Sequence, residues 1–207
     1  MKALILVDIQ NDFLPGGALA VPDGDAIIPN VNRLQDAFPL VVATQDWHPR
    51  NHGSFAANHP GKSVFEQIDL NGLPQTLWPV HCVQRTKGAE LAPNLRRDRI
   101  ARVFQKGTDP RIDSYSGLFD NEHKKSTGLG EWLKEKGVNE VFVCGLATDY
   151  CVKFTALDAI PFGFATSLIA DASRGVNLRS DDVQSAIEEM KRAGVKIIQS
   201  ADILKPV

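Results

Sequence analysis

The sequence predicts an α/β fold in which the strands of a largely parallel sheet are joined by right-handed helical connections. Two observations lead to this class. Six short runs are rich in Val, Ile, Leu, Ala or Phe, and most lack polar alternation, which is typical of parallel strands buried on both faces. Amphipathic helical patterns lie between several of these runs, and strands that alternate with helices favour a parallel sheet.

The predicted strands are spread along the whole chain. They occupy residues 3–7, 40–44, 100–104, 141–144, 164–170 and 195–198. The length of 207 residues suits one domain with a substantial core, and we find no linker or internal repeat that divides it. We therefore expect a single domain over residues 1–207.

Four helices are expected between these strands. The clearest one precedes the last strand and carries an apolar stripe at i, i+3, i+4 and i+7. Ser180 or Asp181 can cap its start, and Gly194 ends it. The other three are expected over residues 25–38, 129–137 and 151–160.

Residues 45–99 interrupt the alternation of strands and helices. This segment shows little periodicity, and it contains Pro49, Pro60, Pro74, Pro79 and Pro93. A long irregular insertion in a compact domain is more often functional than idle. We therefore expect it to contribute to a binding site.

The composition argues against several classes of partner. The chain is 43% apolar and 23% charged with a net charge of −2, so no basic excess attracts nucleic acid or an anionic membrane. The first apolar run is too short for a membrane span or a signal-peptide core.

The three cysteines, Cys82, Cys144 and Cys151, are odd in number and lack CxxC spacing, which favours a reducing cytoplasm. The sequence leaves open whether copies of the chain form a homo-oligomer.

Polar and reactive side chains follow four of the predicted strands. Asp8 comes directly after the first strand, Asp46 and His48 follow the second, Lys106 follows the third, and Cys151 lies a short turn after the fourth. Ligands of parallel α/β sheets bind beyond the carboxyl ends of the strands. We therefore expect these groups to meet at one rim of the sheet and to form a catalytic site.

The position of Cys151 alone allows two interpretations, a small core residue or a nucleophile. A helix N-terminus stabilises an anion, and a nearby Lys106 ammonium would lower the pKa of the thiol further. Asp8 could take the thiol proton, so a Cys–Asp–Lys set requires no histidine as base. Cys144 lies inside a strand and is assigned to the core, whereas Cys82 fits either role.

Asp46 and His48 have the spacing of metal ligands. In an extended segment, residues i and i+2 point the same way, so both side chains can reach one cation. His81, from the irregular insertion, could supply a third ligand. Two or three protein ligands leave positions for substrate or water, as in catalytic metal sites. The Asp-x-His pattern also occurs by chance, in which case both residues belong to a solvated loop.

Aromatic residues near these positions could wall a flat, partly apolar pocket. Ordinary packing explains Trp47 and Tyr115 at least equally well. The candidates are Phe13, Trp47, Trp78, Tyr115 and Tyr150.

Six segments resemble those of the nicotinamidases, also called pyrazinamidases, of the isochorismatase-like superfamily of cysteine hydrolases. The likeness runs in order from residue 3 to about residue 176 and covers most of the chain. It implies a three-layer α/β/α sandwich around a largely parallel six-stranded sheet. The segments are LILVDIQNDF, GGALAV, TQDWHPRNHGSF, WPVHCV, VFQKGTDPRIDSYSGLFD and GLATDYCVKFTALDA.

The resemblance also implies an activity, the hydrolysis of nicotinamide to nicotinate and ammonia in NAD salvage, with pyrazinamide as an accessory substrate. It makes Cys151 the nucleophile, Asp8 the base and Lys106 the third member of the set. His52 falls near a position that some relatives use as a further metal ligand and others do not. The resemblance implies one divalent ion, zinc or alternatively iron or manganese, on Asp46, His48 and His81.

Further residues follow from the resemblance around the reacting carbon. The peptide bond between Leu146 and Ala147 is expected to be cis, which would turn the Ala147 N–H toward that of Cys151 as an oxyanion hole. Tyr150 occupies a position that holds His in some members, so it alters the polarity expected for the pocket. The expected substrate contacts are Phe13, Trp78, Leu146 and Tyr150.

Three functions are compared on this basis: a nicotinamidase, a hydrolase of another small carboxamide, and a ligand-binding relative without activity. The complete Cys–Asp–Lys set argues against the last of these. The metal ligands argue against members of the superfamily that lack a metal. Turnover of nicotinamide separates the first function from the second.

Overall fold

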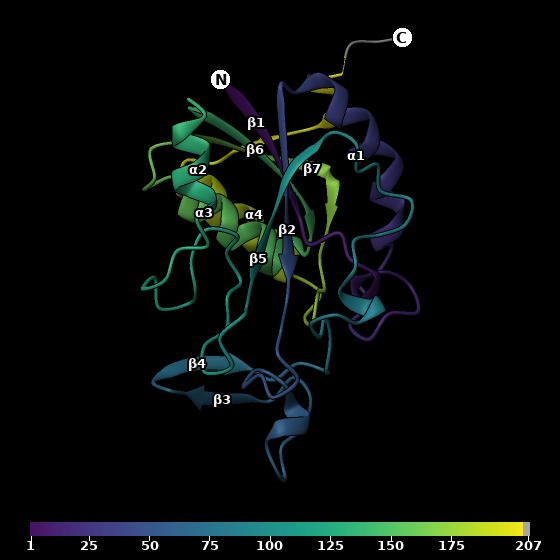
Figure 1. Ribbon diagram of the computed structural model, residues 1–207, viewed down its shortest axis with the longest axis vertical. Helices are drawn as coiled ribbons and strands as arrows, with labels where there is room; N and C mark the ends of the chain where they lie inside the picture. Colours follow the sequence, from purple (N-terminus) through teal and green to yellow (C-terminus); the bar gives the residue numbers. More distant parts are fainter. Residues whose placement is uncertain (205–207) are drawn as a thin grey trace.

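A six-stranded sheet, in which every neighbouring pair of strands is parallel, forms the centre of the protein (Figure 1). The computed structural model describes residues 1–204. The order across the sheet is β5-β2-β1-β6-β7-β8, which confirms the predicted parallel sheet. All six predicted runs are strands: β1 (Lys2–Val7), β2 (Leu40–Asp46), β5 (Ile100–Lys106), β6 (Glu140–Leu146), β7 (Ala165–Arg174) and β8 (Lys196–Ile198).

The two faces of the sheet carry separate apolar clusters. In β1, Leu4 and Leu6 belong to one cluster, and Ala3, Ile5 and Val7 belong to the other. All five side chains are buried. Because successive side chains of a strand point to opposite faces, both faces of β1 are covered. This explains why its sequence is a continuous apolar run.

Helices cover both faces and complete a three-layer α/β/α sandwich, as the resemblance implies. Figure 1 shows α1 on one side of the sheet and α2, α3 and α4 on the other. The clusters agree with this view, since Val31 of α1 packs in the first and Leu133 of α2 in the second. Among residues 1–204, no helix is long and apolar enough to cross a membrane. The helices are α1 (Ile28–Leu34), α2 (Leu129–Glu135), α3 (Lys153–Ala159) and α4 (Asp182–Arg192).

Three details of the helices differ from the prediction. The helix expected over residues 25–38 is divided, because 3-10 turns at Gly24–Ile27 and Gln35–Ala37 flank α1. Asp181 precedes α4 but makes no side-chain capping bond. Cys151 lies in a π-helical turn, Thr148–Val152, and α3 begins only after it. Cys151 is therefore in the first turn of a helix, as expected, but this turn is π-helical and leads directly into α3.

The segment 45–99 is less irregular than expected. It contains an antiparallel hairpin of β3 (Gln67–Leu70) and β4 (Leu73–Thr76). The turn between them uses Asn71 and Gly72, which both have positive φ angles, 55° and 92°, and such turns suit the twist of a hairpin. In Figure 1 the hairpin lies below the sheet, at the end toward which β2 points.

Candidate active site

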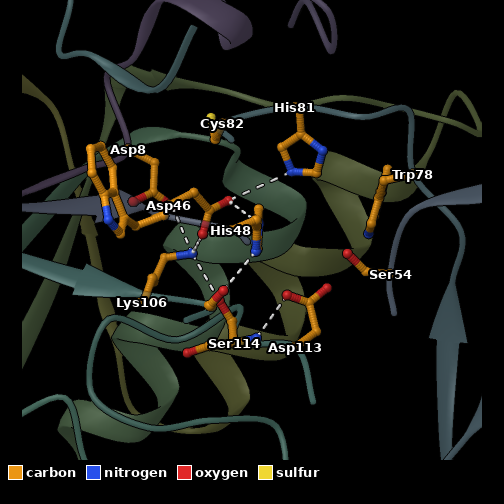
Figure 2. Close-up of polar contacts among 12 residues, drawn as sticks. Asp8, Asp46, His48, Ser54, Trp78, His81, Cys82, Lys106, Asp113 and Ser114 are labelled. Carbon is orange, nitrogen blue, oxygen red and sulfur yellow. Dashed lines mark hydrogen bonds and ion pairs between the residues drawn. The ribbon is translucent and has the colours of Figure 1, made fainter. Parts of the chain in front are cut away.

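Four neighbouring strands deliver four reactive side chains to one edge of the sheet. Asp8 follows β1, Asp46 ends β2, Lys106 ends β5, and Cys151 lies just after β6. The Lys106 ammonium is 3.0 Å from Asp8 Oδ2, 2.5 Å from Asp46 Oδ1 and 3.4 Å from the sulfur of Cys151. Figure 2 shows Lys106 directed toward the two carboxylates. The structure therefore brings the Cys–Asp–Lys set together, with Asp46 as a further partner of the lysine.

Lys106 stays charged although it is buried. Burial alone would lower the pKa of its amine, but the carboxylates of Asp46 and Asp8 together raise this pKa well above its usual value. Burial would likewise raise the pKa of Asp46, but Lys106 and His48 hold it well below the usual range. The centre of the site is thus an ammonium compensated by ionised carboxylate.

Asp8 has one oxygen that is fixed and one that is free to react. Its Oδ1 accepts a hydrogen bond from the Thr44 hydroxyl at 2.6 Å. Its Oδ2 lies near the Lys106 ammonium but has no aligned hydrogen-bond partner among residues 1–204. Burial raises the pKa of Asp8, and the charge of Lys106 offsets this only in part. Asp8 is therefore a more basic carboxylate than an exposed aspartate, which suits proton transfer.

The thiol of Cys151 differs from the expected thiolate. Burial raises its pKa well above the usual value, and the opposing effect of the Lys106 charge is smaller. The negative charge of Asp8 also raises the pKa of the thiol. The expectation of a lowered pKa is therefore wrong for the resting site, which holds a neutral thiol next to a base.

The turn before Cys151 has the backbone that the resemblance implies. The peptide bond between Leu146 and Ala147 is cis. The carbonyl of Ala147 accepts hydrogen bonds from the N–H groups of Tyr150 and Val152, at 3.1 and 3.0 Å. These bonds fix the turn that carries the thiol.

Asp46, His48 and His81 form a buried group that fits a cation. Their ligand atoms all lie within 4.8 Å of one another. The Nδ1 atoms of His48 and His81 are 2.9 and 2.7 Å from the carbonyls of Gly107 and Pro79. Because a carbonyl only accepts, each Nδ1 carries a hydrogen, and the neutral form of each ring would offer its Nε2 lone pair toward Asp46. One carboxylate and two imidazoles are suitable ligands for a divalent transition metal.

His52 lies beside this group. Its ring is 4.3 Å from that of His48, and its Nδ1 is 2.7 Å from the hydroxyl of Ser54. Its Nε2 is buried and has no hydrogen-bond partner within residues 1–204. Burial lowers the pKa of His52 to about 4, so the ring is neutral at pH 7.

Asp113 is a site residue that the sequence did not reveal. It is buried, it lines the same cavity, and its carboxylate lies within 4.8 Å of ligand atoms of His48 and His52. Its oxygens accept hydrogen bonds from Ser114 N–H at 2.8 Å and from Gln75 Nε2 at 3.0 Å. Asp113 follows no strand and has no metal-ligand spacing, so the sequence offered no signal for it beyond the segment that resembles the family.

A single cavity is lined both by the thiol of Cys151 and by the metal-ligand group. Trp78 forms one wall, with its ring 4.8 Å from that of Tyr150 and its indole N–H donating to Tyr115 at 3.2 Å. Leu146, an expected substrate contact, is fully buried and is not among the residues that line this cavity. The lining residues are Phe13, Leu19, Asp46, His48, Trp78, His81, Asp113, Tyr115, Ala147, Tyr150, Cys151 and Val176.

Comparison with protein families gives a match over nearly the whole chain. The isochorismatase domain model matches residues 2–202. The chain belongs to the isochorismatase family. The six-stranded parallel sheet is therefore that of an isochorismatase domain, and the resemblance inferred from the six segments is confirmed.

The similar members of the isochorismatase family carry related names. The chain is 50% identical to the nicotinamidase of Escherichia coli, over 97% of this chain and 96% of the relative. The nicotinamidase–pyrazinamidase of Acinetobacter baumanii is 50% identical over 98% of both chains, with a TM-score of 0.96. The pyrazinamidase of Pyrococcus horikoshii, solved in complex with zinc, is 43% identical over 96% of this chain and 98% of its own, with a TM-score of 0.78.

Proposed function

We propose that this protein is a metal-dependent nicotinamidase that hydrolyses nicotinamide to nicotinate and ammonia through a thioester on Cys151. The observation that carries the proposal is the buried contact of one ammonium, Lys106, with Asp8, Asp46 and the Cys151 sulfur, beside three ligands for a cation. The nicotinamidase names of relatives at 50% identity support the choice of substrate.

The reaction begins with a proton transfer within the buried set. Asp8 takes the proton of the Cys151 thiol, and the sulfur attacks the carboxamide carbon. The backbone N–H groups of Ala147 and Cys151 stabilise the oxyanion, and loss of one such donor typically costs about 100- to 1,000-fold in rate. Asp8 then returns its proton to the leaving nitrogen, which departs as ammonia. Water, deprotonated by Asp8, finally cleaves the thioester to the acid.

Asp46, His48 and His81 would hold the divalent ion, and His52 is a further candidate beside them. When bound, zinc, iron or manganese supplies a positive charge that attracts the lone pair of the pyridine nitrogen. Phe13 and Trp78 would flank the ring, and Tyr150 would close the cavity beside Trp78. Pyrazinamide is included in the proposal because it has a ring nitrogen at the same distance from its carboxamide. We assign the protein to the cytoplasm, which agrees with three free cysteines.

Ammonia release from nicotinamide and pyrazinamide tests the proposal. Cys151→Ala should lower the rate by about 10⁴-fold or more, because removal of a nucleophile abolishes the covalent route. Cys144→Ala is the matched control, since Cys144 is also buried but lies in the core of β6. It should keep the activity.

Two outcomes would reject parts of the proposal. An active Cys151→Ala protein would exclude the thioester mechanism. A wild-type protein that is inert with nicotinamide but releases ammonia from another small carboxamide would retain the mechanism and exclude the substrate.

A further inference from the structure

We infer that Asp12 is a positioning residue that fixes the orientation of His81 through the backbone of Cys82. The inference rests on the metal site that forms part of the proposed function. Asp12 Oδ2 accepts a hydrogen bond from the N–H of Cys82 at 2.7 Å. Cys82 directly follows His81 in the chain, so the carboxylate binds the peptide group that joins the two residues.

The backbone of Cys82 is held on both sides. Its φ angle is 45°, in the left-handed region that residues other than glycine rarely adopt. Its N–H donates to Asp12, and its carbonyl accepts a hydrogen bond from the N–H of His48 at 3.0 Å. The Cys82 conformation is thus determined by these two contacts, and Figure 2 shows Cys82 and His81 beside Asp46.

This arrangement couples the two candidate histidine ligands. The carbonyl of His48 also accepts the N–H of Gln84 at 2.9 Å, so His48 pairs with the segment that follows His81. The His81 Nε2 atom lies 3.8 Å from Asp46 Oδ2. A rotation of the His81–Cys82 peptide would move this nitrogen away from Asp46 and disrupt the ligand group.

Packing fixes the Asp12 carboxylate as well. A Cβ atom at Gly88 would lie 2.1 Å from Asp12 Oδ2, so a larger residue there would displace the carboxylate. The neighbours of Asp12 contact the same segment, with the Phe13 ring 5.6 Å from the His81 ring and the Asn11 amide donating to the Lys87 carbonyl at 2.7 Å. Of these three consecutive residues, Asp12 supplies the side chain that binds the peptide between His81 and Cys82.

The affinity for Zn²⁺, measured by competition with a chromophoric chelator, tests the inference without an activity assay. Asp12→Ala should weaken binding by about tenfold or more, since loss of a residue that orients a ligand typically costs about 10- to 100-fold. Asp12→Asn keeps an oxygen acceptor for Cys82 and should retain more affinity than Asp12→Ala. Asn11→Ala, which loses only the contact with Lys87, should bind Zn²⁺ like the wild type.

The outcomes separate this inference from the proposed function. Wild-type Zn²⁺ affinity in Asp12→Ala, or an equal loss in Asn11→Ala, would overturn the role of Asp12. A wild-type chain that binds no Zn²⁺ would instead overturn the metal site. Thermal unfolding of the metal-free proteins shows whether each variant is folded. If Asp12→Ala does not fold, Gly88→Ala replaces it, and wild-type affinity in that variant would refute the inference.

Discussion

At the residue scale, the site depends on one buried ammonium. Lys106 compensates the carboxylates of Asp8 and Asp46 and also contacts the sulfur of Cys151. An unpaired charge in the interior is costly, so the ammonium and the two carboxylates need one another in order to remain buried. Lys106 therefore acts on both the stability of the fold and the protonation of the reacting groups.

Replacement of Lys106 should affect both properties. Lys106→Met should lower the free energy of unfolding by about 3–5 kcal/mol, because it leaves two buried carboxylates without a cation. Lys106→Met should also abolish ammonia release. Unfolding in urea measures the loss of stability. Lys2→Met is the control, since the exposed pair of Lys2 and Glu140, 3.8 Å apart, is worth about 0–1 kcal/mol. Equal destabilisation by both substitutions would contradict this account.

At the element scale, the end of β5 serves two parts of the site at once. Lys106 reaches the carboxylates, and the carbonyl of Gly107 accepts the Nδ1 hydrogen of His48. Gly107 has a φ angle of 63°, and a Cβ there would lie 2.4 Å from His48 Cε1. The close approach of the chain to the imidazole therefore requires glycine at this position.

Gly107→Ala should consequently displace His48. We expect the affinity for Zn²⁺ to fall by about tenfold or more, because the added methyl group would occupy the space of the ring and push it away from the carbonyl of residue 107. Gly137→Ala is a matched control, since Gly137 also has a positive φ, 73°, but nothing lies within 4 Å of its Cβ position. It should cost about 1 kcal/mol in stability and leave Zn²⁺ binding unchanged. Unfolding and chelator-competition measurements on both variants check these two expectations. Equal Zn²⁺ affinities of Gly107→Ala and Gly137→Ala would exclude displacement of His48.

The elements differ in how well their sequences predict them. β1 and β6 were predictable because they are buried on both faces, which requires a continuous apolar run. The hairpin of β3 and β4 was missed, because its strands are short and Pro74 lies in one of them. The π-helical turn at Cys151 was also missed. The residues of this turn are equally compatible with an α-helical turn, so their sequence does not distinguish a π-helical turn from an α-helical one.

At the scale of the whole molecule, strand order explains which groups meet. β5, β2, β1 and β6 are consecutive in the sheet, and Asp46 is paired in register with Lys106. The sequence could show that each strand ends in a reactive residue, but the order of the strands depends on how the helices cross over. The proximity of Asp113 to His48 and His52 could not be predicted from the sequence either, because only the folded chain brings its loop to these histidines.

The metal-ligand group joins the central sheet to the irregular segment that follows it, since Asp46 is the last residue of β2 and His81 lies farther along the chain, after the β3–β4 hairpin. A cation that binds only the folded chain stabilises it by about 2.7 kcal/mol at a concentration 100 times its dissociation constant. For a protein of this size, that corresponds to an increase in Tm of about 5–10 °C. We therefore expect a chelator to lower the Tm by this amount and to stop nicotinamide turnover, and added Zn²⁺ to restore both. His81→Ala should unfold at nearly the same temperature with and without Zn²⁺, because it lacks one of the three ligands. A wild-type Tm that is the same in chelator and in Zn²⁺ would show that these residues hold no ion that links the two parts of the fold.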